Sequence, residues 1–189
     1  DKTGHARQGL HRFLREFSPR DRVGLTIFDS TTRAIIPIAA MSKNAPLLRN
    51  SVAGLVASGS TALYDATAAA WNAVDALKDD TRINAVVVLS DGADTASTQN
   101  ELSDVLRKLR ARGNGEGRQV RIFTIAYGSD ANGDVLDPTA AASSGNPYSG
   151  HPPTLETVST PLPTFFRCRA PPPPPSRPRA GPAPTTPPP

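Results

Sequence analysis

Apolar residues follow two different periods along this chain, and the alternation between them predicts an α/β fold. Three runs are nearly continuous in apolar residues, at positions 22–28, 84–90 and 119–128. This pattern is typical of parallel strands that are buried on both faces. A shorter strand is expected at 33–38, and Pro37 within it removes one ladder donor and predicts a place at a sheet edge.

Helical periodicity fills the segments between these strands. Helices are expected at 4–17, at 45–55, after a loop that begins at Ser58, and at 98–113, with Gly113 as a C-cap. The expected core positions of the two longest are Leu63, Ala66, Ala70, Val74, Leu77, Leu102, Val105, Leu106 and Leu109. The pattern weakens at 134–145, which begins like a helix but has Pro138 near its start. Alternation of this kind predicts a Rossmann-like, doubly wound, mostly parallel sheet flanked by helices.

Proline and charge divide the chain into two expected regions. Sixteen of the 20 prolines lie at or after Pro147, and the net charge of +4 comes entirely from four arginines after position 166. Residues 1–166 hold 17 basic and 17 acidic side chains, so a basic nucleic-acid face is not expected there. We therefore expect a partial domain at 1–166 and a Pro-rich, disordered tail at 167–189, dispensable for stability from about Ala170.

The cysteine content and the hydropathy of the chain exclude several further classes of protein. Cys168 is the only cysteine, which excludes an internal disulfide and a cysteine-built metal site. No apolar run approaches the ~20 residues of a membrane span. The chain begins without Met and already inside a helical pattern, so we expect a piece of a longer protein. Its compartment stays open, with an extracytoplasmic or membrane-associated parent as one option.

Polar residues gather where the predicted strands end. Asp91 directly follows the strand at 84–90 and Ser90 closes it, with Asp94 three residues later, whereas Ser60 and Thr61 precede a helix. The carboxyl ends of parallel strands form the crevice in which ligands bind. Asp91 therefore either caps a loop or, with the hydroxyls, binds a hard divalent cation. His5, His11 and His151 are scattered and predict no zinc site.

The segments "SGSTALYDA" and "VVVLSDGADT", with the order of elements, resemble a von Willebrand factor type A (vWA) domain. The resemblance implies a protein–protein interaction and adhesion module without catalysis, which binds a protein ligand through Mg²⁺ or Mn²⁺ at a metal-ion-dependent adhesion site. By this likeness Thr61 matches a metal-binding threonine, and Asp91 matches an aspartate that reaches the metal through water. Ser60, Ser90 and Asp94 are supporting candidates.

The chain departs from that family at its start. The Asp-x-Ser-x-Ser motif, which ends the family's first and central strand, is missing, and Asp1 does not replace it. Thr61 and Asp91 would then form only part of a metal shell, with weak or absent metal binding. The strands at 22–28 and 84–90 should be neighbours across a gap or pair directly, with exposed apolar surface that favours aggregation.

Other interpretations of the same residues remain open. The domain could be a metal-dependent hydrolase with a Rossmann-like sheet, or a structural module whose metal site is dead. Asp130, Asn132 and Asp134 have the spacing of a Ca²⁺ loop, and Arg169, Pro172 and Pro175 fit an SH3-like ligand. We interpret Asp65 as a helix-dipole residue and Trp71 as a packing residue.

Overall fold

A computed structural model describes residues 2–56, 59–91, 93–113, 119–127, 133–144 and 147–150. The Pro-rich tail, the Ca²⁺-like residues Asp130 and Asn132, His151, Cys168 and the SH3-like motif lie outside the described residues. The described part contains five helices and five strands. They form a two-stranded antiparallel sheet and a three-stranded parallel sheet flanked by helices, in agreement with the Rossmann-like α/β fold class that the hydrophobic pattern predicts.

The first half of the chain builds an antiparallel strand pair covered by two helices. Helix α1 (Lys2–Arg15) leads to strands β1 (Arg22–Phe28) and β2 (Thr32–Ala40), and helix α2 (Met41–Ala53) follows directly. Strands β1 and β2 pair with each other and with no other described strand, which confirms the edge position of Pro37. The buried Asn44 ties α2 to both strands, because its Nδ2 donates to the carbonyls of Val23 and Pro37, at 2.8 Å each.

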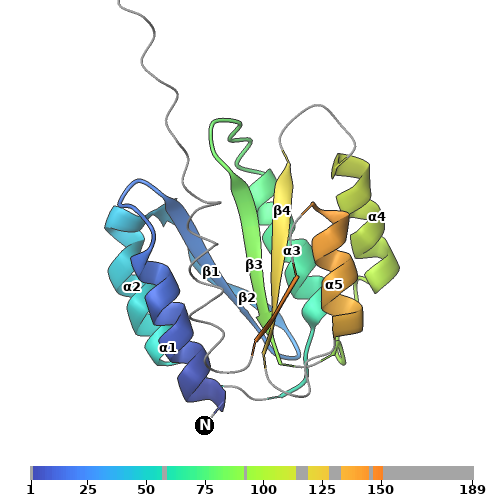
Figure 1. Cartoon of the computed structure of the whole chain (residues 1–189), viewed down its shortest axis with the longest axis horizontal. Helices are drawn as coiled ribbons and strands as arrows, with labels where there is room; N and C mark the ends of the chain where they lie inside the picture. The colour runs from blue at the N-terminus through green and yellow to red at the C-terminus, as the bar shows by residue number, and fades with distance from the viewer. Residues whose placement is uncertain are drawn as a thin grey trace, which may run out of the picture.

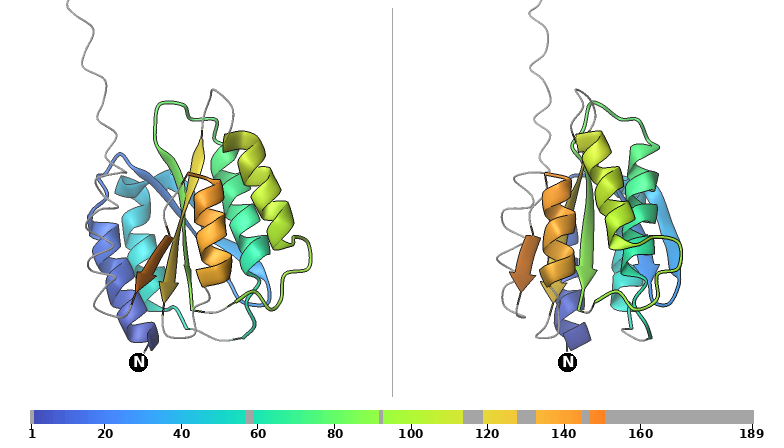
Figure 2. Two further views of the ribbon diagram at one scale, coloured as in Figure 1. Left: turned by 45° about the vertical axis from the view of Figure 1, so that its right-hand side comes forward. Right: turned by 90° about the vertical axis from the view of Figure 1, so that its right-hand side faces the viewer.

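The second half builds a parallel three-stranded sheet. Its elements are α3 (Leu63–Asp75), β3 (Asn84–Ser90), α4 (Leu102–Gly113), β4 (Val120–Tyr127), α5 (Gly133–Ala142) and β5 (Pro147–Gly150). The strand order is β3-β4-β5, and β4 pairs parallel to both of its neighbours. Helices α1 and α2 lie on one side of the strands, and α3, α4 and α5 lie on the other (Figure 1; Figure 2).

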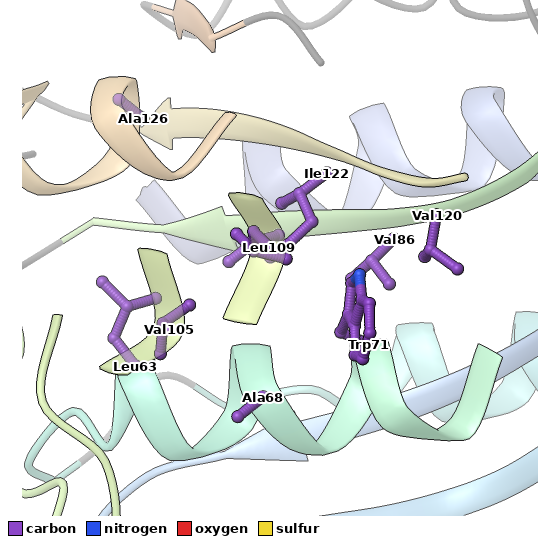
Figure 3. Close-up of a cluster of buried hydrophobic side chains, with 10 residues drawn as sticks. Leu63, Ala68, Trp71, Val86, Val105, Leu109, Val120, Ile122 and Ala126 are labelled. Atoms are coloured by element: carbon purple, nitrogen blue, oxygen red, sulfur yellow. The ribbon is translucent and has the colours of Figure 1, made fainter. Parts of the chain in front are cut away.

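The main core lies between α3, α4 and the β3–β4 pair. Figure 3 shows Trp71 of α3 reaching towards Val86 and Val120, with Leu109 of α4 close to the same strands. Trp71 is only 4% exposed, which confirms its expected packing role. Of the helix positions expected in the core, Leu63, Ala66, Val105 and Leu109 are buried, and the others are half-buried. Leu77 lies past the end of α3, and α4 runs through Gly113 instead of ending before it.

Helix α1 packs against both halves of the chain. Ala6 and Phe13 pack against a cluster that contains Phe123 and Ile125 of β4. Leu14 belongs instead to the cluster of α2 and β2, which contains Ile36, Leu48 and Val52. One amphipathic helix therefore holds the two separate sheets together on their shared face.

Candidate functional site

The loops that follow β1 and β3 meet the start of α3 at one edge of the molecule. The backbone N–H of Ala62 donates to the carbonyl of Asp29, just after β1, at 2.7 Å. The carbonyl of Thr61 accepts the N–H groups of Thr95 and Ala96, after β3, at 2.8 and 3.1 Å. The Thr95 hydroxyl oxygen in turn accepts the Thr61 N–H at 2.9 Å. Thr61 is thus fixed between the two loops, and we name residues 29–31, 59–65, 91 and 93–100 the rim.

Asp94 and Ser97 cap the beginning of α3 from across the rim. Oδ1 of Asp94 accepts the Tyr64 N–H at 3.1 Å and the Ser97 hydroxyl at 2.5 Å. The Ser97 hydroxyl oxygen accepts the N–H groups of Tyr64 and Asp65, both at 3.1 Å. These are N–H groups of the first helical turn, which have no partner within the helix. Burial, and secondly the charge of Asp94, raise the pKa of Tyr64.

Asp65 in turn binds the segment that precedes α4, on the other side of the rim. Its carboxylate accepts the backbone N–H groups of Thr98, Gln99 and Asn100 and the side-chain amide of Asn100. Partial burial raises the pKa of Asp65, but the Asn100 side chain and the three backbone donors outweigh burial and hold the pKa below its usual range. Asp65 does lie in the first turn of α3, as expected, but its main contacts are with the segment before α4.

Asp29 is a rim residue whose contacts the sequence did not reveal. Its Oδ1 accepts the Thr31 N–H at 2.8 Å and the Thr31 hydroxyl at 3.0 Å, and its Oδ2 accepts Arg33 at 3.0 Å. The Thr31 backbone and then the Thr31 hydroxyl hold the pKa of Asp29 below its usual value. Gly59 has a φ of +88° and lies beside Asp29, whose Cβ would be 3.7 Å from a Cβ built on this glycine. The sequence predicts a turn at Asp29–Thr32, and the pairing of an acid with a hydroxyl two residues on is the signal that could also have identified these contacts.

The predicted site residues divide into engaged and available groups. Asp91 is exposed directly after β3, Ser60 is exposed and Thr61 is half-buried. The side chains of Asp91 and Thr61 make no hydrogen bond to any other described residue. Ser90 is 6% exposed and therefore lies within the sheet layer, while Asp94 is engaged in capping α3. The rim brings Thr61 and Asp94 together through shared loops, and Ser90 does not reach solvent with them.

This donor set suits a hard cation only in part. The available oxygens of Thr61 and Asp91 are of the type that Mg²⁺ and Mn²⁺ prefer. Within the described ranges, however, no group of three or more His, Cys, Asp or Glu side chains is placed to hold a metal ion. Thr61 and Asp91 would therefore supply only part of the ligands of an ion at this rim.

Comparisons with known proteins agree with this architecture. The family model of the von Willebrand factor type A domain matches residues 2–159. The human inter-alpha-trypsin inhibitor heavy chain H4 is 25% identical over 151 residues, which cover 76% of this chain and 16% of that protein. The chain therefore spans about a sixth of the length of the curated relative that it matches.

Three solved structures share the fold at low sequence identity. A von Willebrand factor type A protein from Catenulispora acidiphila has a TM-score of 0.67 at 17% identity, covering 85% of this chain and 37% of its own. An aerotolerance-related membrane protein from Bacteroides fragilis has a TM-score of 0.68 at 11% identity, covering 87% of each chain.

The third is proximal thread matrix protein 1 from the mussel byssus, with a zinc-occupied MIDAS motif. It has a TM-score of 0.62 at 13% identity and covers 85% of this chain and 42% of its own. These likenesses concern the fold. The family match extends over more than half of the chain, so this chain belongs to the von Willebrand factor type A domain family.

Proposed function

We propose that this domain is a protein-interaction module that binds its protein ligand at the rim, through a weakly held Mg²⁺ or Mn²⁺ ion. The main support for this proposal is that two oxygen-bearing side chains at the rim are available to bind an ion. The Thr61 hydroxyl and the Asp91 carboxylate lie on loops that hydrogen bonds hold together, and neither forms a hydrogen bond with another residue that the structure describes. A bound ion would offer its open positions to an acidic group of the partner.

The ion's affinity should be low because the domain supplies few ligands. Mg²⁺ gives up its hydration shell reluctantly and requires near-octahedral geometry. Thr61 would bind directly and Asp91 through water, with Ser60 as an exposed supporting hydroxyl. We expect a Kd in the millimolar range or weaker, which corresponds to about 4 kcal/mol or less.

Catalysis is not part of the proposal. Domains of this family are generally interaction modules rather than enzymes. A metal-dependent hydrolase would need a placed base or nucleophile, and the rim carboxylates of Asp29, Asp65 and Asp94 are already engaged in turns and caps. The same engagement favours a second candidate, a structural module in which the rim only joins α3 to α4.

For the partner and the cellular compartment we propose only a general class. No helix in the described part of the chain has both the length and the apolar character needed to cross a bilayer. The ligand is proposed to be a protein because the family mediates protein interactions and residues 1–166 have balanced charge. An extracytoplasmic or membrane-associated parent remains our proposal for location.

Paramagnetic broadening by Mn²⁺ tests the metal site directly. Millimolar Mn²⁺ should broaden the amide signals of residues 60–61 and 91–95 first, and Mg²⁺ should compete. Thr61→Ala and Asp91→Asn should each reduce the broadening, whereas Asp137→Asn, an exposed acid on α5, should leave it unchanged. If neither Thr61→Ala nor Asp91→Asn changed the broadening, the metal site would be rejected and the structural module would be the remaining candidate.

A further inference from the structure

The two helical layers of this domain differ in charge. Helices α1 and α2 contain six basic residues and no acidic one, whereas α3, α4 and α5 contain four basic and five acidic residues. The two layers lie on opposite sides of the strands (Figure 1). The balanced charge of residues 1–166 therefore conceals one helical face that is positively charged.

Helices α1 and α2 lie side by side and run antiparallel. Arg7, near the start of α1, donates to the carbonyl of Ala53 at the end of α2, at 3.1 Å. At the other end, the N–H of Ser42 in the first turn of α2 donates to the carbonyl of Pro19, which follows α1, at 3.0 Å. The end of α1, the segment 16–22 and the start of α2 therefore form one corner of the molecule.

Exposed basic side chains surround this corner and continue along α2. Five of them form no ion pair with a residue that the structure describes. The acids beside them in sequence are Glu16, which is exposed, and Asp21, whose carboxylate accepts the Ser18 N–H at 2.6 Å. Leu47, one turn after Lys43, is 52% exposed. We name this surface the basic face; it consists of Arg15, Arg20, Arg22, Lys43, Leu47 and Arg49.

We propose that the basic face docks on the surface of an anionic lipid bilayer. Lysine and arginine side chains are attracted to anionic headgroups, and each of them near the surface adds to the affinity. The exposed Leu47 lies among them and enters the boundary between headgroups and acyl chains, as apolar residues of surface-bound helices do. The layer of α3, α4 and α5 carries an excess of acidic residues, so it turns away from the bilayer.

The distribution of the charges favours a bilayer over a small anion or a soluble polyanion. They extend from the end of α1 to Arg49 in the second half of α2, which suits a wide surface of many headgroups. A fully polar polyanion would leave Leu47 without a partner. Docking also leaves the rim accessible, because Arg22 begins β1 and Asp29 follows its end. The domain can therefore bind a ligand while it lies on the membrane.

Cosedimentation of the full chain with vesicles tests the proposal. The vesicles contain equal parts of phosphatidylserine and phosphatidylcholine, and the buffer contains EDTA, so that binding is independent of any metal at the rim. The double variant Arg20→Gln with Lys43→Gln should bind roughly 25-fold more weakly, which is about fivefold for each charge removed. Leu47→Ala should bind roughly fivefold more weakly. Vesicles of phosphatidylcholine alone should not retain the chain.

The matched control is Lys78→Gln with Arg110→Gln, which removes two exposed charges outside the basic face. It should bind like the parent chain, and the four arginines of residues 167–189 are present in every variant. No binding to the anionic vesicles, or equal losses in the two double variants, would overturn the proposal. So would unchanged binding of Leu47→Ala together with equally strong binding to polyglutamate, which would assign the face to an acidic polypeptide. None of these results depends on the metal site.

Discussion

Asp65 Oδ1 accepts both the backbone N–H of Asn100, at 2.8 Å, and its side-chain amide, at 2.9 Å. Asp65 lies in the first turn of α3, and Asn100 lies just before α4. Asp94 in return caps the first turn of α3, so the carboxylate of each segment accepts backbone N–H groups of the other. The rim therefore joins two segments 30 to 35 residues apart in sequence through reciprocal carboxylate hydrogen bonds.

Removing the Asp65 carboxylate should destabilise the domain. Asp65→Ala leaves four donors near α4 without an acceptor, and we expect a loss of about 1–3 kcal/mol in the free energy of unfolding. Asp65→Asn retains one oxygen acceptor and should lose less. Urea unfolding measures both. The exposed Asp137→Asn should change stability little, and an equal effect of all three variants would contradict this role of the Asp65 carboxylate.

Acid should weaken the fold through Asp79. The Thr81 hydroxyl and then Arg82 lower the pKa of Asp79 from 3.8 to about 2. A carboxyl with a lowered folded pKa contributes stability that is fully present above its unfolded pKa and is lost as the pH falls through the folded value. Stability should therefore fall between about pH 4 and pH 2. Urea unfolding across this range should show a shallower fall for Asp79→Asn, and equal slopes would reject the assignment.

Two adjacent leucines of α2 provide a matched pair for the second core. Leu48 is 1% exposed, whereas Leu47 is 52% exposed. Leu48→Ala should cost about 2–5 kcal/mol, because it leaves a cavity among Ile36, Met41 and Val52. Leu47→Ala should change stability by about 0.5 kcal/mol or less. Denaturant melts of the two variants measure the difference, and similar values would mean that α2 is packed differently.

Local sequence patterns predicted the elements better than the contacts between them. Strands β1 and β3 have the expected bounds because their continuous apolar runs are local signals. Helix α2 begins at Met41, whereas the sequence pattern predicted a start at Ala45. The pattern missed the first turn because this turn includes the polar Asn44. The burial of Asn44 depends on the carbonyls of Val23 and Pro37, which only the folded chain brings to it.

At the rim, too, the sequence predicted the positions of residues but not the contacts between distant segments. The sequence placed Thr61, Asp91 and Asp94 at one edge because strand ends and helix starts can be located from their patterns. It did not reveal that Asp94 caps α3 or that Asp65 binds the segment before α4, because those partners are 30 and 35 residues away. The short strand β5 was also missed, since four residues containing Pro147 carry no period.

Two glycines test whether the rim loop depends on backbone conformation. Gly59 has a φ of +88°, which disfavours any residue with a Cβ, while the space beside it is ordinary at 3.7 Å from Asp29. Gly59→Ala should therefore cost about 1–2 kcal/mol through strain rather than through a clash. Gly54 follows α2 with a φ of −90°, and its nearest contact would be 3.7 Å away, so Gly54→Ala should be neutral or stabilise by about 0.4–1 kcal/mol.

Urea unfolding separates the two glycine variants by their opposite signs. Hydrogen exchange adds a local readout, because strain at Gly59 should speed exchange of the Ala62 N–H, which donates to Asp29, more than exchange in β4. If Gly59→Ala proves as stable as Gly54→Ala, then position 59 is free to adopt a negative φ. The loop that carries Ser60 and Thr61 would then not be held by its backbone, and the hydrogen bonds from Thr95 and Ala96 alone would fix Thr61 at the rim.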